Sequence, residues 1–443
     1  MLATVLLPCR ATITNQICAA ARSHLDWSAD YRLYSHERVD PSLLFAQVLA
    51  AAHAHAPENQ PLVLAIDDTL IRKTGAHIDG VGWRRDPTGP KFQTNLVRGQ
   101  RYVQLSAAWP LPAGRAQMLP VCFTHAPPAA KPAKNATEAQ KQAFKEEQKQ
   151  RNLNQAAKDC IEEMRAQLPE ERKLVVVGDG SYTNTAIIKS LPANTTYIGR
   201  MRRDAVLHYP PVKNTKSAAG GRPRRYGEEA PTPEALLKDE SKPWISVTAW
   251  AAGKRHEFKV KLSEVVMWRK SGADKPLRVM VIKPLGYRLR KGAKLLYRQA
   301  AYLVCTDPDM SVEEFLQYYL WRWGIEVNFR DEKSLFGVGE AQVRTPASNR
   351  NVPACGVAAY ALLWLAALQA GEGRIERLPC PKWRKTGETK EPGTADLIRL
   401  LRCEQWAEQI SEQSFYHFVT APPDDTTAQK PRTSLPHTLF STA

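Results

Sequence analysis

Four side chains in one stretch of the chain have types and spacings that could serve a common ligand: Tyr319, Arg322, Glu326 and Lys333. Their separations of three, four and seven residues return to the same side of an α-helix, so the four groups would project from one stripe. A carboxylate and a phenol beside two cations suit the binding of a metal ion together with phosphate oxygens. The stripe therefore indicates a site for nucleic acid or nucleotide. The alternative is that Glu326 and Arg322 form an ordinary i,i+4 ion pair on an exposed helix.

The segment that carries this stripe has the start and stop signals of one long helix. Ser311, followed three residues later by Glu314, forms a capping box, and Gly337 ends a stretch that contains no proline. We therefore predict a helix over residues 311–336, with Glu326 on rigid backbone.

Further carboxylates follow two apolar segments that read as buried β-strands. Residues 62–66 are followed at once by Asp67 and Asp68, and residues 174–177 are followed by Gly178 and Asp179. Ligand sites in α/β proteins lie beyond the carboxyl ends of such strands. Each aspartate alone could equally be a turn or helix-cap residue.

Together these segments resemble the DDE transposases of the insertion-sequence group that carry the Y-R-E-K signature. The resemblance rests on residues 65–69 (Ala-Ile-Asp-Asp-Thr), residues 178–184 (Gly-Asp-Gly-Ser-Tyr-Thr-Asn) and the signature stripe, and it spans about residues 60–370. It implies an α/β fold with an RNase H-like, integrase-like core, in which helices flank a mixed sheet. It also implies an inserted β-rich subdomain and helical N- and C-terminal regions.

The resemblance implies that Asp68, Asp179 and Glu326 are catalytic and coordinate two Mg²⁺ or Mn²⁺ ions per active site. The ions would activate water or a DNA 3′-hydroxyl and stabilise the leaving oxygen during in-line displacement. Arg322 and Lys333 would bind phosphates, and Tyr319 would position an oxygen or stack on a sugar.

The implied partners are double-stranded DNA, as element terminal repeats and as target, and a second copy of the chain in a homodimer on DNA. Two alternatives remain: a metal-dependent nuclease on the same fold, and a catalytically inactive, domesticated DNA-binding protein.

The segments between the motifs predict how the strands are arranged. An alternating run at 102–109 and an apolar run at 119–123 would form an antiparallel meander with the first strand, and residues 135–168 a crossover helix. A right-handed crossover places the strand at 174–177 parallel to the first, which brings Asp68 close to Asp179.

Adjacent strand residues point to opposite faces. We take Asp68, which precedes Thr69 as in the family motif, to face the site, and Asp67 to be the alternative if the strand bulges or ends earlier.

The long separation between Asp179 and Glu326 predicts an insert. Eight basic residues lie within 200–226, against the single acid Asp204. Alternating runs at 244–250 and 257–268 indicate that the insert is rich in β-strands, and residues 301–305 would form the last core strand. Three arginines flanked by glycines would form a loop along a DNA backbone: Arg222, Arg224 and Arg225. Three tryptophans could stack on bases, although packing within the insert is the simpler interpretation: Trp244, Trp250 and Trp268.

Composition agrees with a nucleic-acid partner. The formal net charge is +17, from 62 Lys and Arg against 45 Asp and Glu, and such a balance favours a polyanion. The eight cysteines form no C-x-x-C pair, so we predict neither a zinc site nor disulfides. With no basic leader at the start of the chain, we expect a bacterial cytoplasmic, nucleoid-associated protein. The uncharged segment 352–371 is predicted to be a buried helix rather than a membrane span.

The chain is therefore divided into five regions. Residues 1–58 form a helical region that binds DNA or packs on the core, with one helix started by Asp40 and Pro41. Residues 59–200 and 300–372 are the two parts of the core, and 201–299 are the insert. Residues 373–443 are a linker, a helix at 395–412 for dimerisation or packing, and a disordered tail.

Overall fold

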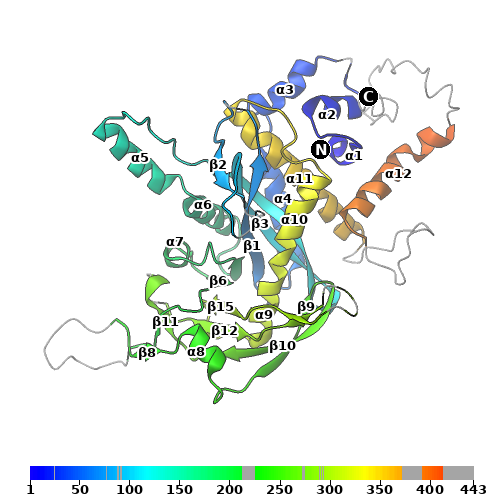
Figure 1. Cartoon of the computed structure of the whole chain (residues 1–443). Coiled ribbons are helices and arrows are strands. Elements are labelled where there is room, and N and C mark those ends of the chain that lie inside the picture. The colour runs from blue at the N-terminus through cyan, green and yellow to red at the C-terminus, as the bar shows by residue number, and fades with distance from the viewer. Residues whose placement is uncertain are drawn as a thin grey trace.

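The computed structural model describes residues 1–371 and 392–412, apart from residues 24, 76, 87–88, 90–91, 212–224, 272–274, 289, 291 and 293. The fold is mixed α/β: a ten-stranded mixed sheet runs through the molecule, and helices flank it (Figure 1). The strand order is β2-β3-β1-β5-β6-β15-β12-β10-β9, and β4 pairs with β3.

The centre of the sheet contains the strands that carry the aspartates. Its members are β1 (Leu62–Arg72), β2 (Gly82–Arg85), β3 (Leu96–Leu111), β4 (Arg115–His125), β5 (Leu174–Gly178) and β6 (Thr195–Arg200). Strands β1, β3 and β4 form the predicted antiparallel meander, and β5 lies parallel to β1 and to β6. Continuous apolar runs form β1 and β5 because both faces of these strands are covered.

The prediction that the first strand ends just before the aspartates is wrong, because β1 continues to Arg72. Pairing with β5 stops at Ala65↔Val177, but pairing with β3 continues through Asp67 and Asp68 to Arg72. The hairpin partner β3 holds β1 extended after β5 has diverged. The two aspartates therefore lie within β1, beside the gap that β5 leaves, whereas Asp179 follows the end of β5 as predicted.

The inserted segment is rich in strands, and several of them extend the main sheet. Its elements are β7 (Leu207–His208), β8 (Glu229–Ala230), α8 (Pro233–Lys238), β9 (Ile245–Ala251), β10 (Lys254–Leu262), β11 (Met267–Trp268), β12 (Arg278–Ile282), β13 (Gly286–Tyr287) and β14 (Leu296–Tyr297). The return strand β15 (Ala301–Cys305) pairs with β6 on one side and β12 on the other. Through β15, the strands β12, β10 and β9 continue the main sheet instead of forming a separate one.

Helices cover both faces of the sheet. Four helices precede β1: α1 (Leu2–Leu6), α2 (Ile13–Ala19), α3 (Trp27–Ser35) and α4 (Pro41–His55), the last with Asp40 as its N-cap and Pro41 as its first residue. On one face α4 and α6 (Leu153–Ala166) pack against Leu62, Leu64 and Ile66. On the other, α9 (Val312–Trp321) and α10 (Trp323–Ser334) pack against Val63 and Ala65. The alternation of β1 thus assigns odd-numbered residues to the face of α9 and α10.

The predicted helix at 135–168 is two helices. Helix α5 (Glu138–Gln150) has no buried residues and projects from the body, while α6 buries Cys160, Ile161 and Met164 (Figure 1). The break follows from capping, because Asn152 accepts a hydrogen bond from the Gln155 amide and so starts a new helix. The short helix α7 (Thr185–Lys189) then connects β5 to β6.

The predicted helix at 311–336 is nearly continuous. Ser311 caps α9 by accepting a hydrogen bond from the Glu314 amide, and Gly337, with φ of +59°, follows the end of α10. A single turn residue, Arg322, separates α9 from α10 and itself has helical dihedral angles. The stripe geometry is therefore preserved across the junction.

The uncharged segment forms α11 (Pro346–Ala370), which packs on α4 and β4. By length and composition it could cross a membrane, but 78% of its most apolar window is buried inside the protein, as predicted for a core helix. Helix α12 (Thr394–Glu412) buries Leu397, Ile398 and Trp406, whereas Leu400 is exposed. The predicted linker and tail lie outside the described residues.

Candidate active site

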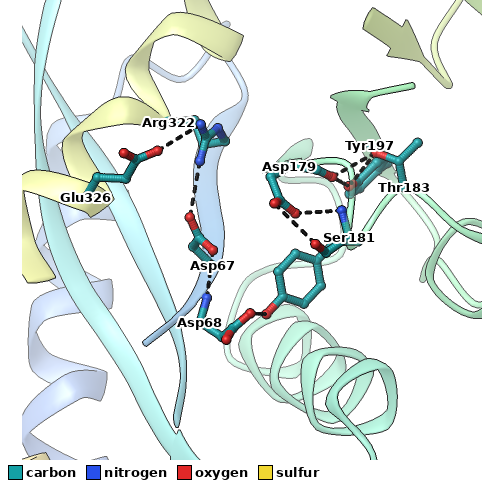
Figure 2. Close-up of polar contacts among 9 residues, drawn as sticks. Asp67, Asp68, Asp179, Ser181, Thr183, Tyr197, Arg322 and Glu326 are labelled. Carbon is teal, nitrogen blue, oxygen red and sulfur yellow. Dashed lines mark hydrogen bonds and ion pairs between the residues drawn. The ribbon is translucent and has the colours of Figure 1, made fainter. Parts of the chain in front are cut away.

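The candidate site lies where β1 and β5 diverge. Asp67 and Asp68 are on β1, Asp179 is on the turn after β5, and Glu326 is on α10 (Figure 2). Segments far apart in sequence meet here because β5 is parallel to β1, α10 packs against β1 and β4, and α9 packs against β5. The structure links Asp67 to Glu326 through Arg322, and the charge of Asp179 acts on both Asp67 and Asp68.

Arg322 links the signature helix to the first strand. Its Nη1 lies 3.2 Å from Asp67 Oδ2 and its Nη2 lies 3.1 Å from Glu326 Oε1 (Figure 2). The guanidinium also lies over the Tyr319 ring, 5.9 Å from its centroid. The Arg322 side chain is only 12% exposed, so these ion pairs are much less screened than surface pairs.

Asp68 points to other partners. Arg101 Nε on β3 lies 3.0 Å from Asp68 Oδ2, and the Tyr182 hydroxyl donates to Asp68 Oδ1 at 3.0 Å. Tyr182 belongs to the core on the face opposite α9 and α10. The ion pairs therefore group Asp67, rather than the predicted Asp68, with Arg322 and Glu326. The physical reason is the alternation of β1, which continues through both residues and turns Asp68 toward the opposite face.

Asp179 is held by its own turn. The Ser181 amide donates to Asp179 Oδ1 at 2.8 Å, and Ser181 Oγ lies 3.3 Å from Oδ2 (Figure 2). The Thr183 hydroxyl donates to the Asp179 carbonyl oxygen at 2.9 Å, and Thr183 Oγ1 also lies 3.2 Å from the hydroxyl of the fully buried Tyr197. These bonds fix both the backbone and the carboxylate of Asp179.

Burial and neighbouring carboxylates raise the pKa of both aspartates of β1. The pKa of Asp67 is raised to about 7, first by burial and also by the charges of Asp179 and Asp68, while Arg322 opposes the shift. Burial and Asp179 likewise raise the pKa of Asp68, against the effect of Arg101 and of the Tyr182 hydrogen bond. Negative charge is therefore under-compensated in this cluster, and a divalent cation with oxygen ligands would relieve it.

The carboxylates fit such a cation by chemistry, but their arrangement keeps Glu326 apart. Within the described part of the chain, no three His, Cys, Asp or Glu side chains already lie close enough to hold one metal ion. Arg322 stands between Asp67 and Glu326 and forms an ion pair with each. For the two carboxylates to share a metal ion, Arg322 has to release at least one of them.

Among the basic residues other than Arg322 that were predicted to contact DNA, the structure describes Lys333 and Arg225. Lys333 is exposed on α10; the surrounding protein atoms lower its pKa, and the carboxylates of Glu332 and Asp68 oppose that shift. Arg225 lies in an exposed bend of the insert, and Arg222 and Arg224 lie outside the described residues.

The three tryptophans of the insert have packing partners. Trp268 is buried. Lys261 and Lys283 lie over the ring of Trp244, and Arg115 lies over the ring of Trp250. These contacts favour the packing interpretation over base stacking.

Two arginines of this environment were missed by the sequence reasoning. Arg101 pairs with Asp68, and Arg84 on β2 is close enough to Arg101 and Asp68 for their charges to act on its pKa, which burial lowers. The Nε and Nη2 atoms of Arg84 are buried and have no hydrogen-bond partner among the described residues. The available signal was a basic residue, Arg101, directly before the alternating run at 102–109.

Comparison with known families gives a match over the part of the chain that carries the three aspartates. A family model described as DDE superfamily endonuclease matches residues 2–265, which is more than half of the chain and includes all three aspartates. The matched region ends before α9 and α10, so the place of Glu326 in the site rests on its geometry. A comparison with curated proteins finds no match. The chain belongs to the DDE superfamily endonucleases.

Proposed function

We propose that this protein is a transposase of the insertion-sequence group with the Y-R-E-K signature, which cleaves DNA at the ends of its element and joins them to a target. Membership of the family implies a nuclease-type enzyme with DNA as its substrate. The observation that carries the finer assignment is the double ion pair of Arg322 with Asp67 and Glu326. It joins the signature helix to the strand that holds the aspartates.

The sheet supports an RNase H-like, integrase-like core. Strands β4, β3, β1, β5 and β6 lie side by side in that order, with β1, β5 and β6 parallel and β3 antiparallel to β1. This arrangement supports the proposal because Asp67 lies on the first strand and Asp179 follows the neighbouring parallel strand. Helix α10 then adds a glutamate from the face that Asp67 shares.

Asp67, Asp179 and Glu326 are the residues that would hold Mg²⁺ or Mn²⁺. When bound, two such ions would activate the attacking water or 3′-hydroxyl and stabilise the leaving oxygen. The protein supplies the rest of the site. Asp179 is oriented by hydrogen bonds from Ser181, Thr183 and Tyr197. Asp68 forms an ion pair with Arg101 and so holds this arginine beside the site.

Arg322 and Lys333 are proposed to bind phosphates next to the scissile bond. A guanidinium forms paired hydrogen bonds to phosphate, so Arg322 can exchange a carboxylate for a phosphate oxygen at low cost. Tyr319 lies under the guanidinium and would keep it in position during the exchange. A homodimer on DNA and a cytoplasmic location are parts of the same proposal.

The test is metal-dependent cleavage of a duplex that ends in the element's own terminal repeat, taken from the DNA flanking the gene. Wild type is compared with Asp67→Asn, Asp68→Asn, Asp179→Asn and Glu326→Gln, each checked for folding by thermal unfolding and for DNA affinity. We expect Asp67→Asn, Asp179→Asn and Glu326→Gln to lose cleavage but keep DNA binding, and Asp68→Asn to retain partial activity.

Three other outcomes would contradict the proposal or its assignment of the first metal ligand. Cleavage without regard to the repeat would favour a nuclease, and tight binding without cleavage by wild type would favour a domesticated DNA-binding protein. Loss of cleavage in Asp68→Asn with activity in Asp67→Asn would reverse the assignment of the first ligand.

A further inference from the structure

Helix α10 carries buried polar side chains on the side away from the candidate site. Asn328, Asp331 and Glu332 are 0%, 6% and 1% exposed. At about 100° per residue they lie on the face opposite Glu326 and Lys333, which share one side through their seven-residue spacing. A helix that only packed on the core would present apolar residues there, so these three require partners.

Asn328 connects α10 to three other elements. Its Nδ2 donates to Ser106 Oγ on β3 at 3.2 Å and to the Met118 carbonyl oxygen on β4 at 3.1 Å. The Tyr360 hydroxyl on α11 donates to Asn328 Oδ1 at 2.8 Å, and Tyr360 is fully buried. The amide thus uses both ends, and each bond constrains its direction.

Glu332 extends the same network along β3. Gln104 Nε2 donates to Glu332 Oε1 at 3.0 Å and also lies 3.2 Å from Ser106 Oγ. Gln104 pairs directly across the sheet with Asp67. The network therefore joins the far side of α10 to the strand that lies next to Asp67.

Asp331 ties α10 to the C-terminal helix. The hydroxyl of Thr394, the first residue of α12, donates to Asp331 Oδ2 at 2.6 Å, and Trp364 Nε1 on α11 donates to the Thr394 hydroxyl at 3.1 Å. Arg330 Nε donates to the other carboxylate oxygen at 2.8 Å. Thr394 is 2% exposed, so three helices meet at one buried hydroxyl.

We propose that Asn328, Asp331 and Thr394 are positioning residues that fix the rotation of α10 and so hold Glu326 and Lys333 toward the aspartates. Apolar packing is non-directional and tolerates rotation of a helix, whereas buried hydrogen bonds are directional and costly to leave unmade. The role of α10 in catalysis rests on the proposed function, but its restraint by α11 and α12 does not. The C-terminal helix is, on this view, a structural part of the active site.

The first measurement is hydrogen–deuterium exchange of the α10 amides in the full-length protein without DNA. Thr394→Val removes the hydroxyl and keeps the shape, Thr394→Ser restores the hydroxyl, and Ser271→Ala is a matched loss of a buried hydroxyl that bonds a backbone carbonyl in the insert. We expect exchange within 323–334 to be about tenfold faster in Thr394→Val, and close to wild type in Thr394→Ser and Ser271→Ala.

The second measurement separates positioning from general stability. For Thr394→Val we expect the Mg²⁺ concentration at half-maximal cleavage to rise several-fold while DNA affinity stays within about twofold, with Thr394→Ser restoring the wild-type value. If Thr394→Val does not fold, Tyr360→Phe tests the same network, because it leaves Asn328 Oδ1 without its donor.

Unchanged exchange of α10 in Thr394→Val and Tyr360→Phe would overturn the proposal, as would equal impairment of Thr394→Val and Thr394→Ser. If wild type cleaves no DNA, the proposed function fails, and the exchange measurement still decides whether the network restrains α10.

Discussion

At the scale of single residues, the site is governed by one guanidinium and the carboxylates that compete for it. Arg322 forms an ion pair with both Asp67 and Glu326, while burial, together with the negative charges of Asp179 and Asp68, raises the pKa of Asp67 to about 7. A proton, Arg322 and a divalent cation are therefore three ways of balancing the same charge. On the proposed function, metal binding would displace the proton, and the apparent metal affinity would then depend on pH.

We expect Mn²⁺ to bind the DNA-free protein about tenfold more tightly per pH unit up to about pH 7, and with little further change above it, because one proton is released from Asp67. The thermal shift produced by Mn²⁺ between pH 5.5 and 8.5 measures this. In Asp67→Asn the step near pH 7 should vanish. A step that persists in this variant would assign the proton to another group.

The buried carboxyl of Glu332 gives a second pH effect, on stability. Burial raises its pKa to about 8, against the hydrogen bond from Gln104 and the charge of Lys333. Because the folded state holds the proton more tightly than the unfolded chain, this group makes its full contribution to stability at low pH. That contribution is lost as pH rises from about 4.5 through 8.

Glu332→Gln should therefore be more stable than wild type at pH 9, by on the order of 2 kcal/mol, and equal to it near pH 5. The amide introduced by this substitution still offers an oxygen to Gln104, so the hydrogen bond is preserved. Urea unfolding at both pH values checks the difference. Equal stability at pH 9 would mean that Glu332 is ionised without cost in the folded protein.

At the scale of elements, α10 packs closely against β4, and this close approach sets where Glu326 lies relative to β1. A Cβ on Gly324 would overlap Met118 Cγ and lie 3.2 Å from Met118 Cβ. Gly324 precedes Glu326 by two residues, so any displacement of the helix here moves the carboxylate. The glycine is thus required by packing rather than by its backbone dihedral angles.

We expect Gly324→Ala to destabilise the protein by about 1–3 kcal/mol through overpacking and to reduce cleavage. In a Met118→Ala background the same substitution should cost much less, because the overlapping Cγ is gone. Thermal or urea unfolding of the four proteins of this cycle measures the coupling. Additive effects would show that α10 shifts freely to accommodate the methyl group.

At the scale of the whole molecule, the net charge of +17 predicts DNA binding that weakens steeply with salt. Arg84, with buried nitrogens that lack a partner among the described residues, and the exposed Lys333 lie beside the carboxylate cluster and are the cations expected to meet phosphates there. We therefore expect the charge of the chain to attract DNA and these side chains to hold it against the site.

Lys333→Ala and Arg84→Ala should each lower the magnitude of the slope of log K against log salt concentration by about 0.9, the value for one phosphate contact. Lys141→Ala, which removes a lysine paired with Glu138 on the projecting helix α5, is the control and should leave the slope unchanged. Fluorescence anisotropy with a labelled duplex gives the slopes. An unchanged slope for Lys333→Ala would contradict its role as a phosphate ligand.

Local patterns in the sequence were sufficient for the parts of the site that depend on period and capping. The spacing of Tyr319, Arg322 and Glu326 placed them on one side of a helix because α9 and α10 continue the helical period across Arg322. The apolar runs before Asp67 and Asp179 predicted strands because buried strands need apolar residues on both faces. The parallel pairing of these strands followed from the crossover helix between them.

Only the tertiary structure showed which aspartate shares the guanidinium of Arg322 with Glu326. That choice depends on β1 remaining extended past the end of its pairing with β5, which is set by its partner β3 and not by the residues of β1 themselves. The same applies to Arg84 and Arg101, to the insert strands that continue the sheet, and to the buried partners of Asn328 and Asp331. The sequence determined the elements because helical and strand periods depend on neighbouring residues. The fold determined the site because the site consists of contacts between segments far apart in the chain, which no local pattern specifies.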